Sequence, residues 1–318
     1  MNADAHARYQ RLLDIASSLP PLPTAVVHPC DAVSLRSTIE AAQLGIIEPI
    51  LVAPPDRLVS VARAHDIDIS GYCVVASEHS HDSARKGVEL VREGRVNALK
   101  KGSLHTDEVM SAVVARDTGI RTERRISHCF VMDVPGYDDG LIITDAAVNI
   151  APDLEAKVDI VQNAIDLATA LGAEARVAIL SAMETINPKV PSTIDAAALC
   201  KMADRGQITG GILDGPLALD NAINAEAARI KNIISPVAGR ATILVVPDLE
   251  AGNMLAKSLS FLAGADAAGI VLGAKVPVIL TSRADSVLSR RASCAVASLV
   301  AEHRRKVQGK VLSASRPA

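Results

Sequence analysis

Short apolar runs alternate with alanine-rich amphipathic stretches along most of this chain. The run "AVVHPC" at residues 25–30 predicts a strand, and "DAVSLRSTIEAAQLG" after it predicts a helix that Asp31 caps and Gly45 ends. The same unit recurs in "PILVAPP" with "DRLVSVARAHD", in "YCVVAS" with "HDSARKGVELVREG", and in "VNALKKG" with "HTDEVMSAVVARDTG". Four strand-helix units in succession predict a parallel α/β layer with right-handed crossovers.

The pattern changes near residue 125. "RISHCFVMDVPG" and "GLIITDAAVNI" predict two strands whose connection is too short for a helix, and therefore an antiparallel pair. Further apolar strands then alternate with helices predicted over 154–172, 192–206, 219–231, 249–264 and 286 to about 305. We place a domain boundary at the antiparallel pair: residues 1–124 plus 275–318 form a discontinuous first α/β domain, and residues 125–274 form the second.

The composition narrows the class of protein. Hydrophobic residues make up 49% of the chain and aromatic residues only 2%, so the core consists of small aliphatic side chains, which suits parallel strands under helices. The net charge of -3 and the lack of interleaved basic and aromatic residues argue against a nucleic-acid surface.

The cysteine pattern and the N-terminal sequence indicate whether disulfides, a metal site or a signal peptide are expected. The 5 cysteines never form a CxxC motif, and "HSH" at 79–81 has no third ligand nearby, so neither a disulfide framework nor a metal site is predicted. No signal-peptide pattern and no run of about 18 apolar residues occurs, so we expect a cytoplasmic protein that does not interact with a membrane.

Open α/β sheets bind ligands in the loops after their strands, and four such loops are unusually polar. "KKGSLHT" at 100–106 places Lys101, His105 and Thr106 before a helix, although an ordinary cap by Thr106 explains the motif equally well. "GIRTERR" at 119–125 brings together three arginines, which are either a solvated surface or forked donors for phosphate: Arg121, Arg124 and Arg125.

The other two polar loops lie in the second half of the chain. "VVPDLEAGN" at 245–253 contains Asp248 and Asn253, and helix capping alone would account for Asp248. "TSRADS" at 281–286 ends a strand with Ser282 and Arg283 and starts a helix at Asp285 or Ser286, where free N–H groups favour an anion. Capping does not explain Arg283, a cation at the positive end of a helix dipole, so an anion is expected there.

Together these motifs resemble the phosphate acetyltransferase and phosphate butyryltransferase family. The resemblance covers residues 20 to about 305, and it rests on "VVPDLEAGNMLAKSLSFLAGADAAGIVLGAKVPVILTSRADS" preceded in order by "KGSLHTDEVMSAVV", "GIRTERRISHCFVMDVPG" and "LIITDAAVNIAPD". It implies two α/β domains with a cleft between them, similar to the isocitrate and isopropylmalate dehydrogenases, in a homodimer. It also implies reversible acyl transfer between coenzyme A (CoA) and inorganic phosphate, with acetyl favoured and butyryl as the alternative.

The resemblance also assigns roles to residues. Ser282 would donate to the developing oxyanion or the departing thiolate, Arg283 would hold phosphate or the acyl carbonyl, and one of the three arginines of 119–125 would line the cleft. CoA and phosphate would be substrates, bound with help from Lys101, His105, Thr106, Asp248 and Asn253, and no metal or tightly bound cofactor is implied.

One position departs from the acetyl branch of the family, which carries an acid seven residues after the serine. Ser289 stands there in this chain, so Asp285 is the hypothetical general base. The same departure motivates an alternative, a catalytically inactive module that binds CoA and phosphate. A β-decarboxylating dehydrogenase is a weaker alternative, because the second half of the chain lacks the clustered aspartates that would bind its metal.

Overall fold

The computed structural model describes residues 7–282 and 285–314. It divides into two compact units. The continuous unit is Arg125–Ala267, and the discontinuous unit is Ala7–Arg124 together with the described residues from Ala268. The second boundary therefore falls at residue 268 rather than 275, because the strand over Asp266–Leu272 pairs with the strand that follows it.

The discontinuous unit is a sheet with the strand order β3-β2-β1-β4-β11-β10. All neighbours are parallel except β10 and β11, so the predicted parallel layer is confirmed. The strands are β1 (Leu22–Val27), β2 (Ile47–Ala53), β3 (Cys73–Ala76), β4 (Ala98–Lys101), β10 (Asp266–Leu272) and β11 (Val278–Ile279).

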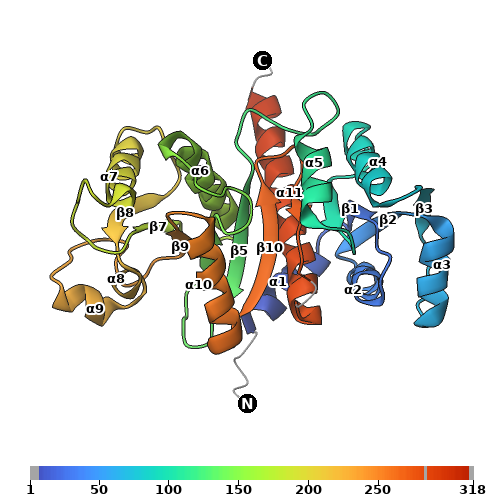
Figure 1. Cartoon of the computed structure of the whole chain (residues 1–318), viewed down its shortest axis with the longest axis horizontal. Helices are drawn as coiled ribbons and strands as arrows, with labels where there is room; N and C mark the ends of the chain where they lie inside the picture. The colour runs from blue at the N-terminus through green and yellow to red at the C-terminus, as the bar shows by residue number, and fades with distance from the viewer. Residues whose placement is uncertain (1–6, 283–284, 315–318) are drawn as a thin grey trace. The chain divides into compact units, whose positions relative to one another are not determined.

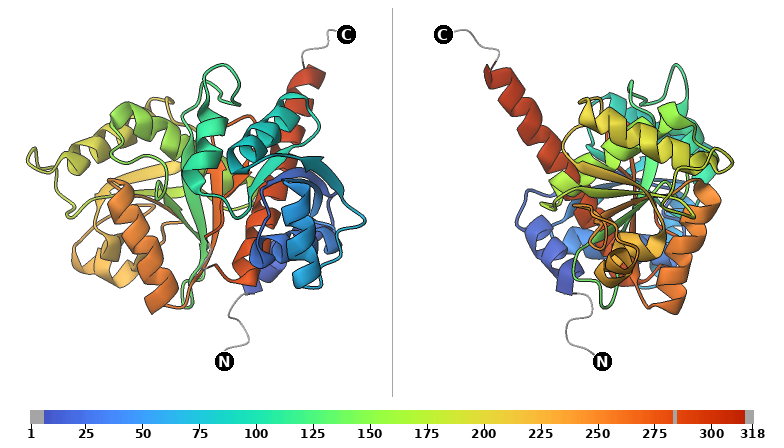
Figure 2. Two further views of the ribbon diagram at one scale, coloured as in Figure 1. Left: turned by 45° about the vertical axis from the view of Figure 1, so that its right-hand side comes forward. Right: turned by 90° about the vertical axis from the view of Figure 1, so that its left-hand side faces the viewer.

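Helices cover both faces of this sheet. The helices are α1 (Ala7–Ser17), α2 (Ala32–Gln43), α3 (Pro55–Ala64), α4 (Ser80–Arg92), α5 (Thr106–Val114) and α11 (Val287–Ala314). Helices α4 and α5 lie on one face, and α1, α2, α3 and α11 lie on the other (Figures 1 and 2). As predicted, Asp31 caps α2, because its carboxylate accepts the Ser34 N–H at 2.7 Å, and Gly45 follows the helix end with a φ of 70°.

In the continuous unit the strands follow the order β5-β6-β9-β7-β8. The strands are β5 (Ser127–Asp133), β6 (Leu141–Thr144), β7 (Arg176–Leu180), β8 (Ile212–Leu217) and β9 (Ile243–Val245). The predicted antiparallel pair is confirmed in β5 and β6, and the other neighbours are parallel.

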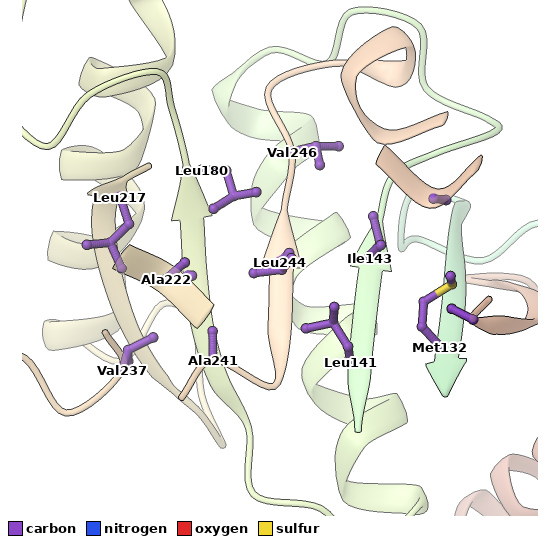
Figure 3. Packing of buried hydrophobic residues seen from close by; sticks show 13 residues of the cluster. Met132, Leu141, Ile143, Leu180, Leu217, Ala222, Val237, Ala241, Leu244 and Val246 are labelled. Atoms are coloured by element: carbon purple, nitrogen blue, oxygen red, sulfur yellow. The ribbon is translucent and has the colours of Figure 1, made fainter. Parts of the chain in front are cut away.

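Helices also cover both faces of the layer that these five strands form. They are α6 (Leu154–Ala170), α7 (Pro191–Asp204), α8 (Leu219–Ile223), α9 (Ala225–Ile230) and α10 (Leu249–Leu262). Helices α6 and α7 lie on one face and α8, α9 and α10 on the other (Figure 1). Figure 3 shows the aliphatic core of this unit, where Leu244 of β9 lies between Ile143 of β6 and Leu180 of β7.

Two expectations about helices were wrong in detail. The helix predicted over 219–231 is two helices, because Asn224 ends α8 and its side chain accepts the Ala227 N–H, which starts α9. The last helix continues beyond residue 305 to Ala314, and Glu302 pairs with Arg305 and Lys306 across its next turn. Helix α1 was not predicted at all. None of the helices in the described part of the chain combines the length and the hydropathy that a membrane span requires.

Candidate functional site

The polar loops of the discontinuous unit meet where its strand order reverses, between β1 and β4. The chain leaves β1 for α2 on one face and reaches β4 from α4 on the other, which opens a crevice at the carboxyl ends of these strands. A pocket of about 700 Å³ lies there. Its polar lining includes His28, Arg57, Ser103, His105, Glu108 and Arg290.

His28 connects the loop after β1 with the loop after β4, and both loops line the pocket. It follows β1 with a φ of 56°, and its carbonyl accepts both the N–H (2.9 Å) and the hydroxyl (2.8 Å) of Ser103. Gly102 permits this approach, since a Cβ there would lie 2.5 Å from the His28 oxygen. Burial lowers the pKa of His28, and Arg57 lowers it further, so the imidazole is neutral at neutral pH. Sequence reasoning missed His28, although it is polar and ends a strand.

Arg290 is the buried cation of the pocket. Its residue is only 4% exposed, and its guanidinium donates to the Ser282 carbonyl at 2.6 Å, the Asp285 carbonyl at 3.3 Å and the Thr281 hydroxyl at 3.3 Å. One planar fork therefore holds the loop before α11 while it lines the pocket. Sequence reasoning missed Arg290, because the residue reads as an ordinary helix position and only its side-chain contacts reveal the role.

The predicted catalytic stretch is only partly described, since Arg283 lies outside the described residues. The Asp285 carboxylate accepts the Ser282 N–H at 2.6 Å. Burial raises the pKa of Asp285, against the opposing effects of that N–H, Arg290 and Lys101. Asp285 does not cap α11, because Ser286 does so by accepting the Ser289 N–H at 3.0 Å.

The "KKGSLHT" loop contributes to the same pocket. Lys101 is 7% exposed, while His105 is exposed and lies in the pocket lining. Thr106 is the first residue of α5 and not its cap, so that expectation was wrong. Instead His105 precedes the helix, and the Glu108 carboxylate reaches back to accept the His105 N–H at 2.7 Å.

In the continuous unit, Asp248 and Asn253 lie at the corresponding switch point, between β6 and β9. Asp248 caps α10 by accepting the Ala251 N–H at 2.8 Å. The Asn253 amide donates to the Ala146 carbonyl, just beyond β6, at 3.2 Å. Both residues therefore organise the loops at the carboxyl ends of these strands.

The loop after β6 is built on a buried carboxylate that sequence reasoning did not single out. Asp145 is 2% exposed and accepts the N–H groups of Ala147 (2.9 Å) and Val148 (3.0 Å) and the Asn149 side-chain amide (2.6 Å). It also accepts the N–H groups of His128 and Asn149, both at 3.2 Å. The carboxylate thus fills a cradle of donors that fixes the loop.

The three arginines of residues 119–125 are divided between the units. Arg121 is exposed and its backbone bridges to Ala274 in the discontinuous unit, to which Arg124 also belongs. In the continuous unit, Arg125 donates from Nε to the Asn149 side-chain oxygen at 2.6 Å, which ties it to the Asp145 loop.

This geometry is that of an α/β protein with a cationic pocket at a strand switch point, and comparisons identify its class. Residues 74–297 match the family described as "Phosphate acetyl/butaryl transferase". The chain therefore belongs to the phosphate acetyl/butyryl transferase family, which confirms the resemblance inferred from its motifs.

Among its relatives, the phosphate acetyltransferase of Rhizobium meliloti is 65% identical over 95% of this chain and 96% of its own length. The phosphate butyryltransferase of Clostridium acetobutylicum is 41% identical over 84% of this chain and 89% of its own length. The chain is thus more similar to the former than to the latter.

Solved structures agree on the fold. A branched-chain phosphotransacylase from Enterococcus faecalis has a TM-score of 0.78 at 29% identity, and the match covers 89% of this chain and 99% of that one. A 4-hydroxythreonine-4-phosphate dehydrogenase from Klebsiella pneumoniae has a TM-score of 0.53 at 12% identity over 88% of this chain and 99% of that one, a similarity of fold alone. The predicted dehydrogenase-like α/β class is confirmed.

Proposed function

We propose that this chain is a phosphate acetyltransferase, which interconverts acetyl-CoA plus phosphate with acetyl phosphate plus CoA. The observation that carries the proposal is the 65% identity, over nearly the whole length of both chains, to a phosphate acetyltransferase. The buried Arg290 in the pocket of the discontinuous unit supports it, because both substrates are anions. Phosphate-dependent release of CoA from acetyl-CoA tests the function.

The reaction needs groups that bind phosphate and stabilise an oxyanion, and residues near this pocket could supply them. A phosphate oxygen attacks the thioester carbonyl carbon, an oxyanion forms, and the C–S bond then breaks as the electron pair leaves with sulfur. Arg290 would hold the phosphate, and the Ser282 hydroxyl would donate to the oxyanion or the departing thiolate. By the family resemblance Arg283 assists, with one arginine from 119–125 and with Lys101, His105, Thr106, Asp248 and Asn253 as substrate contacts.

Cys30, the one cysteine among the described residues that line the pocket, is not suited to carry the acyl group, which favours direct transfer without a covalent enzyme intermediate. Cys30 lines the pocket, and burial raises its pKa to about 11, so it is a protonated and weak nucleophile at neutral pH. The acyl group would therefore pass between CoA and phosphate when both are bound.

Asp285 is the proposed general base for the CoA thiol in the direction of acetyl-CoA synthesis. The Asp285→Asn variant should lower kcat at least about tenfold, because an amide cannot take the thiol proton. Because burial raises the pKa of Asp285, the parent enzyme should lose kcat as the pH falls through that raised value, and the variant should lack this acidic limb. A pH series of CoA-dependent acetyl phosphate consumption measures both effects.

Asp107→Asn is the matched control, since Asp107 is an exposed carboxylate in the first turn of α5. It should leave kcat and its pH profile unchanged. Near-normal turnover of Asp285→Asn would refute this base assignment, and the neutral His28, which also lines the pocket, would be the next candidate to test.

The oligomeric state and the cellular location are proposed from the family resemblance. We expect a homodimer, which the molar mass in solution would establish, and a cytoplasmic enzyme that uses CoA as a substrate and holds no tightly bound cofactor. Exposed apolar side chains on α10 are consistent with a partner surface: Met254, Phe261 and Leu262 are 63%, 74% and 87% exposed.

A further inference from the structure

Lys100 is a fully buried lysine that the proposed mechanism does not use. Its residue is 0% exposed, and its ammonium donates to two hydroxyls of α2, Thr38 Oγ1 at 3.0 Å and Ser37 Oγ at 3.3 Å. Among the described residues no carboxylate forms an ion pair with it. Burying a charge without an oppositely charged partner costs folding free energy, so we expect Lys100 to have a functional role that offsets this cost.

Lys100 lies on the strand whose following loop lines the pocket, and its ammonium lies beside α2, the helix that begins at the pocket. On β4 it is paired with Val26 of β1 and Ile279 of β11, and the next residue, Lys101, opens the loop that lines the pocket. The ionisable groups that interact with it are Asp31 before α2, Lys101 on its own strand, and Arg290 and Cys294 on α11. Two of these groups, Asp31 and Arg290, line the pocket themselves.

We propose that Lys100 is a buried electrostatic residue that raises the affinity of the pocket for the phosphate substrate without touching it. This inference rests on the proposed function and adds a positioning residue to it. A dianion beside Arg290 would lie near the positive charges of Lys100, Lys101 and Arg290, which the carboxylates of Asp31 and Asp285 offset only in part. In the low-dielectric interior such a charge acts over longer distances than it would in water.

The same burial makes the effect dependent on pH. Burial lowers the pKa of Lys100 to about 8, with Arg290 and Lys101 acting in the same direction and Cys294 and Asp31 against it. As the pH rises through this value, the lysine loses its charge and the pocket should lose affinity for a dianion. Burial of the charged form also opposes folding below that pH, and this penalty is relieved as the pH rises.

The Lys100→Met variant tests the proposal, because methionine fills similar space without charge. We expect the apparent Kd for sulfate, measured by calorimetry at pH 7, to rise at least about tenfold. Sulfate replaces phosphate as the probe because it keeps both charges across the tested range. The Tm should rise, since the buried charge is gone. A residue needed only for packing would not combine a higher Tm with weaker anion binding.

Lys157→Met is the matched control. Lys157 is also buried, but it donates to Asp195 at 2.6 Å in the continuous unit. Its loss leaves a carboxylate without its partner, so the Tm should fall while sulfate affinity stays unchanged.

The pH dependence of sulfate binding to the unaltered chain is a second test of the proposal. It can be measured even if the Lys100→Met variant does not fold. The sulfate Kd of the unaltered chain should rise between about pH 7 and about pH 9, and this rise should be absent in Lys100→Met. A pH-independent Kd in the unaltered chain, or an unchanged Kd in a folded Lys100→Met, would overturn the proposal. Sulfate binding needs no turnover, so these outcomes are separate from a failure of acetyl transfer.

Discussion

The Arg290→Gln variant is expected to lower kcat/KM for phosphate by about a hundred- to a thousandfold. Glutamine keeps a polar side chain but removes the charge and the planar fork that faces the pocket and holds the Ser282 and Asp285 carbonyls. Loss of one preorganised donor at a developing charge has an effect of this size. Steady-state kinetics with phosphate as the varied substrate measures it, and the KM for phosphate should rise as well.

The neighbouring residue offers a control for this variant. Arg291 lies next to Arg290 on α11 but faces Glu40 of α2, with its Nε 3.8 Å from a carboxylate oxygen. Arg291→Gln should therefore keep kcat/KM within about twofold of the parent value. If Arg290→Gln behaved like Arg291→Gln, the pocket of the discontinuous unit would not be the phosphate site.

The second large effect is expected on stability. Asp145→Asn should lower the free energy of unfolding by about 3 kcal/mol, because an amide NH₂ would then face N–H donors in a site that is 2% exposed. Water cannot replace the lost acceptor in so buried a position. Urea denaturation at neutral pH measures the change.

Asp153→Asn provides the matched control, since Asp153 accepts one N–H, that of Ala156, as the cap of α6. Asparagine caps helices about as well as aspartate, so the change should stay below about 0.5 kcal/mol. If Asp145→Asn were equally mild, the loop after β6 would be held by its backbone and not by the buried carboxylate.

The order of strands and helices could be predicted because its signals are local. Asp31 and Gly45 mark the two ends of α2 in the sequence itself, and the apolar runs mark the strands. The break at Asn224 could not be predicted in the same way, because the alanine-rich pattern continues across it. Whether such a residue ends a helix depends on the elements against which the chain packs.

In the candidate site, too, some residues could be predicted from the sequence and others could not. Polar residues that follow apolar runs in the sequence indicate the loop of Ser103 and His105, and both residues line the pocket. Arg290 and Asp145 could not be found by that rule, because each acts through several contacts that converge only in the folded chain. The identity of the capping residue also depended on geometry, since Asp285 and Ser286 are both good caps and only Ser286 accepts the Ser289 N–H.

Release of the CoA thiol from acetyl-CoA, propionyl-CoA and butyryl-CoA, each with and without phosphate, tests the central claim most directly. We expect release that requires phosphate, yields one acyl phosphate for each thiol, and is fastest with acetyl-CoA. Preference for a longer acyl chain would change the substrate, because one or two methylenes shift specificity by only about 1–3 kcal/mol each. Absent release, or release that does not need phosphate, would contradict the claim that this chain is a phosphate acetyltransferase.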